Sequence, residues 1–284
     1  MARFDWYQGS APCDVRALQG VLDGLALSPR WEPMQRAPHG YAFGAKLHDD
    51  DGQAAMVWWG GTHERPHFVI SGETAQPGAE LLRTHLPGHT VSRADTCIDY
   101  AEPGAYDRLQ GIALDVARDR SIRVGTAGDH LVTMQGRTLY LGATTSHTRL
   151  RLYDKAAELR AKFAHDPVRL QAVPTELARL ESQVRPQTPQ AKAAAAVADP
   201  LSLMGSAAWM RALMAAVAGL DLAPFEAGKV WRQSDDDRAY AALLAQYGGL
   251  LSRIKVDLGG WDCVGLQIGS DLAERSEVKR RAGR

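Results

Sequence analysis

Short segments in which charged and apolar residues alternate constrain the fold of this chain most strongly. In residues 149–155, RLRLYDK, a strand conformation would send successive side chains to opposite faces. Leu150 and Leu152 would then share one face, while the basic residues and a tyrosine share the other. Residues 92–100 and 179–185 alternate in a similar way. Such segments are typical of strands that pack on a core with one face and present polar groups on the other.

The order of the elements that the sequence predicts indicates an α+β protein. A strong turn signal, DDDG, separates apolar strands at residues 41–47 and 54–59, which predicts a hairpin. A further short strand is predicted at residues 130–134, and the chain becomes alanine-rich and helical after residue 187. We therefore predict an α+β domain over residues 1–187 and a helical C-terminal region of unassigned role over residues 188–284.

Composition limits the classes of partner and compartment. Lys and Arg total 33, as do Asp and Glu, so the formal net charge is zero and any nucleic acid must be bound by a local patch. The three cysteines, Cys13, Cys97 and Cys263, are too widely spaced for a disulfide framework, which favours a reducing cytoplasm. The apolar stretch 201–220 contains Arg211, so we expect a buried helix there and no membrane span.

The basic strand indicates phosphate binding next to a phenol. Tyr153 shares its predicted face with Arg149, Arg151 and Lys155. Arginine forks match phosphate oxygens, and a lysine adds a point charge. Positive neighbours would favour the phenolate, which matters because a phenol with a pKa of about 10 is a weak nucleophile. The alternative is a structural tyrosine, since tyrosine is common in strands.

Two aspartates on one strand face suggest a cation site. Asp95 and Asp99 share a face with Arg93, although aspartate is disfavoured inside strands. Two carboxylates so placed repel each other unless a positive charge lies near them, and Mg²⁺ or Mn²⁺ prefers such oxygens. In the alternative interpretation, both aspartates pair with arginines or lie on a hydrated edge.

A third strand adds one more carboxylate to the same argument. Arg179, Glu181, Gln183 and Arg185 share a face in residues 179–185. Glu181 is a candidate third metal ligand. Taken alone, this segment favours a surface strand with cross-strand ion pairs.

Together the three strands suggest phosphodiester chemistry. Carboxylates would hold a divalent metal that polarises the scissile phosphate, while the cations of the basic strand stabilise the developing charge. Tyr153 would attack in line and become joined to DNA. The phosphotyrosine would preserve the phosphodiester energy, so that the strand could later be rejoined.

Four motifs occur in an order that resembles a known family. They are R-x-D-x-x-x-D at residues 93–99, T-x-Y-x-G at 138–142, R-x-Y-D-K-x-x-E at 151–158 and R-x-E-x-Q-x-R at 179–185. This pattern is similar to the Rep_trans family of replication initiation factors, the rolling-circle initiators of certain plasmids and filamentous phages, with related conjugative relaxases. The resemblance covers roughly residues 40–190.

The resemblance implies a fold, a nucleophile and a metal site. The expected fold is a curved antiparallel sheet flanked by helices. Tyr153 would be the nicking tyrosine, and Asp95, Asp99 and Glu181 would bind Mg²⁺ or Mn²⁺. For the flanking strands we predict contacts to DNA by the residues Arg93, Arg179, Gln183 and Arg185.

The expected function is initiation of rolling-circle replication at a specific origin. The protein would nick one DNA strand, stay linked to the 5′ phosphate and leave a 3′-OH as primer. A host helicase and polymerase would be required, because the sequence contains no G-x-x-x-x-G-K-[ST] loop. The helical region could form a homodimer, recognise DNA or dock a helicase.

Three other functions remain open at this point. One is a conjugative relaxase with the same chemistry, another is a non-catalytic DNA-binding regulator, and the third is a structural protein whose charged residues form ion pairs. A nickase that binds metal through a His-hydrophobic-His pair is not indicated. The nearest histidines, His63 and His67, follow no such pattern, and Pro66 prevents a helix from presenting both.

Overall fold

The computed structural model describes residues 1–49, 52–228 and 235–282. The chain divides into two compact units, Met1–Lys229 and Val230–Arg284. The second unit contains helices α9 (Asp235–Leu258) and α10 (Trp261–Ala282), which pack on each other. Residues 188–228 lie with the sheet in the first unit, so the compact units divide later in the chain than the boundary predicted after residue 187.

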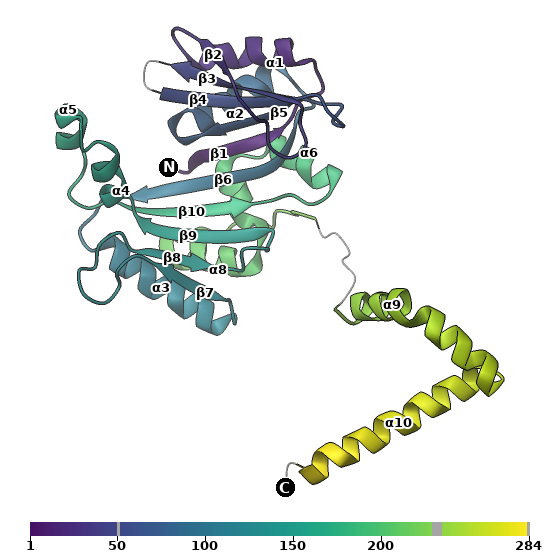
Figure 1. Ribbon diagram of the computed structural model, residues 1–284. Helices are drawn as coiled ribbons and strands as arrows, with labels where there is room; N and C mark the ends of the chain where they lie inside the picture. Colours follow the sequence, from purple (N-terminus) through teal and green to yellow (C-terminus); the bar gives the residue numbers. More distant parts are fainter. Residues whose placement is uncertain (50–51, 229–234, 283–284) are drawn as a thin grey trace. The chain divides into compact units, whose positions relative to one another are not determined.

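The described part of the first unit contains one open antiparallel sheet of ten strands, which confirms the predicted α+β class (Figure 1). The strand order is β2-β3-β4-β5-β1-β6-β10-β9-β8-β7. In chain order the strands are β1 (Arg3–Ser10), β2 (Arg30–Pro33), β3 (Phe43–Asp49), β4 (Gly52–Trp59), β5 (His67–Ser71), β6 (Thr90–Tyr100), β7 (Val124–Ala127), β8 (Thr138–Leu141), β9 (Thr148–Asp154) and β10 (Ala178–Val184).

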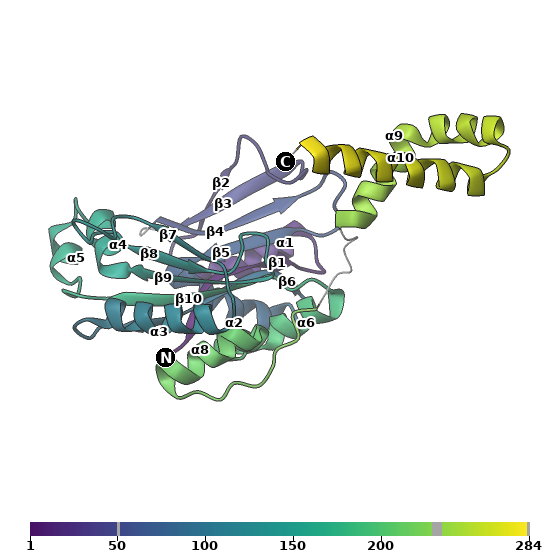
Figure 2. The same ribbon diagram turned by 90° about the horizontal axis from the view of Figure 1, so that it is seen from below.

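Helices cover one face of this sheet. Figure 2 shows α2, α3, α6 and α8 on the same side of the strands, and α1 packs beside α2. None of the helices in the described ranges is long and apolar enough to cross a membrane. The helices of the first unit are α1 (Val15–Leu22), α2 (Ala75–His85), α3 (Ala105–Asp119), α4 (Lys155–Lys162), α5 (Pro167–Gln171), α6 (Pro189–Val197), α7 (Pro200–Leu203) and α8 (Ala208–Ala218).

Local signals explain where the helices after β10 begin. The Thr188 hydroxyl accepts a hydrogen bond from the backbone N–H of Ala191, and a proline occupies the first turn of α6. Asp199 caps α7 in the same way. The helix expected over residues 201–220 is divided by a 3₁₀ turn at Met204–Ser206, and its second half, α8, is partly buried as predicted.

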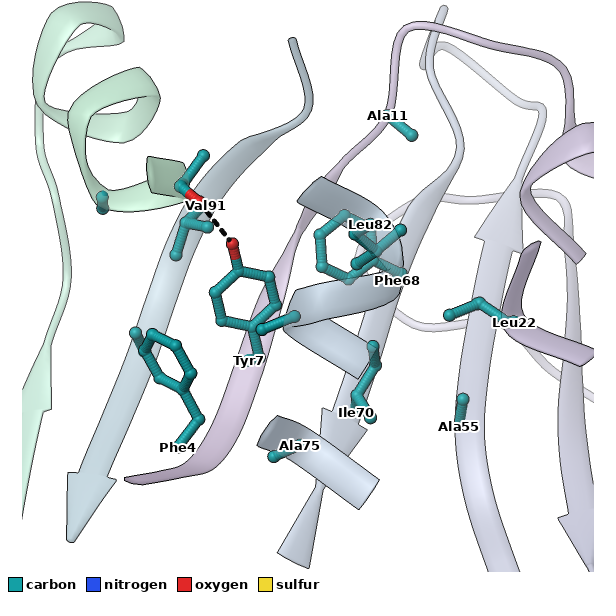
Figure 3. Close-up of a cluster of buried hydrophobic side chains, with 14 of the residues drawn as sticks. Phe4, Tyr7, Ala11, Leu22, Ala55, Phe68, Ile70, Ala75, Leu82 and Val91 are labelled. Carbon is teal, nitrogen blue, oxygen red and sulfur yellow. Dashed lines mark hydrogen bonds between the residues drawn. The ribbon is translucent and has the colours of Figure 1, made fainter. Parts of the chain in front are cut away.

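Two apolar clusters lie between the sheet and the helices. Figure 3 shows the first cluster, where the Tyr7 ring of β1 lies between Phe4 of the same strand and Phe68 of β5. The Tyr7 hydroxyl donates to the backbone carbonyl of Ala196 at 3.2 Å, which ties β1 to α6. The second cluster contains Leu150 and Leu152 together with residues of α3 and α8, so the predicted core face of β9 is confirmed.

A β-bulge in β1 changes which side chains lie on the open face of the sheet. Phe4 pairs with Thr96 but Trp6 pairs with Asp95, so Asp5 is an extra residue in the ladder. A bulge of this kind turns two successive side chains toward the same face. Phe4 is in the core, whereas Asp5 and Trp6 line a cavity on the open face.

Candidate active site

A cavity of about 320 Å³ lies on the open face, where five neighbouring strands contribute its walls. The register places Arg149, Gln183, Asp95 and Trp6 in one cross-strand row. The neighbouring row contains Tyr140, Arg151 and Glu181. The residues that line the cavity are Asp5, Trp6, Arg93, Asp95, Tyr140, Arg149, Leu150, Arg151, Glu181 and Gln183.

Two of the predicted metal carboxylates are buried at this cavity. Asp95 is 2% exposed and Glu181 is 6% exposed. Arg93 donates to both oxygens of Asp95, and Arg151 donates to Glu181 at 2.7 Å. Burial raises the pKa of both acids, and the nearby charge of Asp95 raises the pKa of Glu181 further. The charge of Asp5 also raises the pKa values of Asp95 and Glu181, which indicates that the three carboxylates lie close together.

Asp99, the other predicted ligand, has both oxygens engaged by arginines. It accepts hydrogen bonds from Arg3 at 2.6 Å and from Arg179 at 2.6 and 2.9 Å. Burial opposes ionisation, but these hydrogen bonds outweigh it and lower the pKa of Asp99. Arg179 also binds Asp5 at 2.7 Å. Asp99 thus corresponds to the alternative interpretation, an aspartate paired with arginines.

Tyr153 lies beneath the cations that surround it. It is 5% exposed, and its ring centroid is 4.2 Å from the Arg151 guanidinium carbon and 5.7 Å from Lys155 Nζ. The charges of Arg179 and Arg151 lower the pKa of Tyr153, as expected of positive neighbours, but they do not set its net direction. Burial raises the pKa of Tyr153, and this effect outweighs the nearby arginines.

The tyrosine that reaches the cavity is Tyr140, in the T-x-Y-x-G motif. It is partly exposed, and its ring centroid is 4.2 Å from the guanidinium carbon of Arg149. Arg149 Nε is buried without a hydrogen-bond partner, and no carboxylate within the described ranges forms an ion pair with this guanidinium. Arg149 therefore offers a cation next to a phenol on the cavity wall.

The remaining predicted residues lie at or near the same face with partners of their own. Lys155 forms an ion pair with Glu158 at 2.6 Å. Gln183 donates to Asp95 at 3.4 Å, and Arg185 donates to a backbone carbonyl in the loop before β9. Of the predicted DNA contacts, Gln183 and Arg93 line the cavity.

The cavity includes residues that the sequence did not single out. Asp5 and Trp6 enter through the bulge in β1, which leaves no signature in the sequence. Tyr140 had a signal, because its motif belongs to the family pattern that the chain resembles, but the three cations around Tyr153 drew the assignment away from it.

The carboxylates of the cavity have the chemistry to bind a divalent cation, but they are not arranged as a metal site. Among the described residues, no group of three His, Cys, Asp or Glu side chains is arranged to hold a metal ion. Asp5, Asp95 and Glu181 supply the oxygen donors that Mg²⁺ and Mn²⁺ prefer, but each is hydrogen-bonded to an arginine. A metal site here stays a prediction.

Comparisons with known proteins yield similarities to solved structures and none to a family model or a curated sequence. The chain is similar to the structure of a rolling circle replication initiator protein from Geobacillus stearothermophilus, with a TM-score of 0.49 and 17% sequence identity. The match covers 84% of this chain and 90% of that chain. A similarity at this level assigns no function, so the resemblance to the Rep_trans family stays a prediction.

Proposed function

We propose that this protein nicks and rejoins one strand of DNA at an origin, as an initiator of rolling-circle replication. One observation carries the proposal: the Tyr140 phenol and the Arg149 guanidinium lie side by side on a cavity wall that also holds Asp95 and Glu181. Among the described residues, no carboxylate forms an ion pair with this guanidinium. A nucleophile, a phosphate-binding cation and acidic groups are the parts that phosphodiester transfer requires.

We assign the nucleophile to Tyr140 because of its exposure. Tyr153 is almost fully buried, and its raised pKa disfavours the phenolate. The Tyr140 oxygen would form a bond to phosphorus as the bond from phosphorus to the 3′ oxygen breaks. The products are a 5′-phosphotyrosine and a free 3′-OH, and attack by a 3′-OH reverses the step without a nucleotide cofactor.

Arg149 would bind the scissile phosphate. Its planar guanidinium can donate two parallel hydrogen bonds to phosphate oxygens, and these strengthen as negative charge develops. Arg151 is held by Glu181, so its charge already serves to compensate that carboxylate.

Asp95, Glu181 and Asp5 are the residues that would hold Mg²⁺ or Mn²⁺. When bound, the metal supplies a Lewis acid that polarises the scissile phosphate. Arg93 and Arg151 would then have to release some of the carboxylate oxygens that they now contact.

The test is a nicking assay on a supercoiled plasmid that carries the DNA flanking the coding sequence, with Mg²⁺ or Mn²⁺ present. We expect the wild type to relax the plasmid and form a covalent adduct. Tyr140→Phe should abolish the adduct, whereas Tyr153→Phe should retain it. The reverse result would return the nucleophile to Tyr153.

The second candidate function is a DNA-binding regulator without catalysis. The arginine partners of Asp5, Asp95 and Glu181 favour it, since carboxylates that are already neutralised have less need of a metal. Specific binding of the plasmid without nicking, at every metal concentration, would support the regulator.

A further inference from the structure

The wall of the cavity opposite Arg149 carries an aromatic ring. Trp6 lies there at the bulge of β1, and the Arg93 guanidinium carbon is 4.5 Å from its ring centroid. The indole Nε1 donates to the side chain of Gln8 at 2.9 Å. The indole is therefore held by a hydrogen bond at its edge and by a cation at its face.

The indole N–H of Trp6 and two of the three guanidinium nitrogens of Arg93 are occupied within the protein. The guanidinium of Arg93 donates to both oxygens of Asp95, and Asp95 is nearly fully buried. Trp6 has no polar atom besides the one bound to Gln8. The wall thus offers the planar groups of Trp6 and Arg93 to a ligand. The opposite wall offers the cation of Arg149, which no carboxylate of the described ranges neutralises.

The spacing between the two walls suits one unpaired nucleotide. Arg149 and Trp6 are at the ends of a row that crosses four neighbouring strands. Three strand spacings of about 4.8 Å separate their Cα atoms by about 14 Å. The volume of about 320 Å³ is at the small end of the range for ligand sites and leaves no room for a duplex.

We propose that Trp6 and Arg93 form a stacking wall for an unpaired nucleobase next to the phosphate held by Arg149. This inference rests on the proposed function, because it names the ligand of the same cavity as single-stranded DNA. Bases stack on aromatic rings and on arginine planes with little dependence on sequence. Trp6 is a positioning residue in this arrangement, since it holds the base and does not contact the reacting atoms.

The test measures binding of two labelled probes to the full chain by fluorescence anisotropy in EDTA, so that no metal-dependent cleavage occurs. One probe is a twelve-nucleotide oligo(dT), and the other is the same backbone with every base removed. We expect the wild type to bind oligo(dT) more tightly. Trp6→Ala should weaken binding of oligo(dT) by about tenfold, the order expected for one lost stacking contact, and leave the abasic probe unchanged. Trp6→Phe should restore most of the difference.

A matched control uses Trp261→Ala, which removes a 53% exposed tryptophan from α10, and it should bind both probes as the wild type does.

Equal weakening of both probes by Trp6→Ala would show that Trp6 only supports Asp95 and would overturn the inference. So would a wild type that does not distinguish the probes. If Trp6→Ala does not fold, the Trp6→Phe variant and the wild-type preference between the probes still decide the matter. The covalent adduct is measured separately, so its absence would reject the proposed function, whereas an adduct without base preference would reject only the stacking wall.

Discussion

Individual residues at this site depend on partners that lie far away in the sequence. Glu181 is buried and its charge is compensated by Arg151, which lies on the neighbouring strand. Sequence alternation correctly predicted that Leu150 and Leu152 of β9 lie in the core, whereas Arg149 and Arg151 line the open face. It could not predict which arginines, Arg3 and Arg179, form ion pairs with Asp99. Those pairs depend on strand register and on β1, which is far from β10 in the chain.

Removing Arg151 should destabilise the fold. Arg151→Ala would leave the buried Glu181 carboxylate without its counter-charge. We expect a loss of about 2–3 kcal/mol in the free energy of unfolding, below the usual range of about 3–5 because Arg151 is itself partly exposed. Urea denaturation at neutral pH measures it.

The control for that measurement is Arg118→Ala, which breaks an exposed ion pair with Asp115. It should cost less than about 1 kcal/mol. Equal losses in the two variants would contradict the view that burial makes the Arg151–Glu181 pair important.

At the scale of elements, local hydrogen bonds can override a predicted strand. Residues 130–134, expected to be extended, form a loop in which the Asp129 carboxylate accepts hydrogen bonds from the backbone N–H groups of Leu131, Val132 and Thr133. These bonds lower the pKa of Asp129 well below its ordinary range. An Asp that binds several following amides favours a turn, which the apolar pattern of the segment did not reveal.

The packing of β5 against β4 makes stability depend on pH. The His67 ring stacks on Trp58 with a centroid distance of 5.2 Å, and burial lowers the pKa of His67 to about 4. At a pH between about 4 and about 6.5, the pKa of histidine in an unfolded chain, the His67 ring is protonated mainly in the unfolded state. The contribution of His67 to the free energy of unfolding should therefore be fully present above pH ~6.5. It should fall by about 3 kcal/mol as the pH drops to about 4.

Chemical denaturation at pH 7.5 and pH 5 should show about 2 kcal/mol of this loss, with His67→Gln as the comparison. The variant cannot titrate at this position, so its stability should fall less over the same interval. Parallel losses in wild type and variant would assign the pH dependence to other groups, such as His89, whose pKa burial also lowers.

At the scale of the whole molecule, the sheet and its helices contain the two apolar clusters described above. Their members lie within the first compact unit, Met1–Lys229. Helices α6 and α8 complete that core, although the sequence placed them with the helical C-terminal region. An alanine-rich helical pattern shows that a segment is helical, but it does not show which surface the helix will cover.

A chain of residues 1–229 should therefore fold without the second unit. We expect its melting temperature, measured by circular dichroism, to stay within a few degrees of the full chain. A chain of residues 1–187 is the control, and it should fail to fold because it lacks α6 and α8 and exposes the surfaces of β6 and α3 that these helices contact. Stable folding of the shorter chain would support the predicted domain boundary.

The sequence by itself determined the α+β class, the alternation of faces in the polar strands and the gathering of acidic and basic groups on one side of the sheet. These properties follow from local periodicity, which neighbouring residues encode. Only the tertiary structure decided that Asp5 and Trp6 join the cavity and that Tyr140 reaches it while Tyr153 is buried. A bulge, a strand register and the depth of a side chain depend on contacts between distant segments, and no short stretch of sequence contains them.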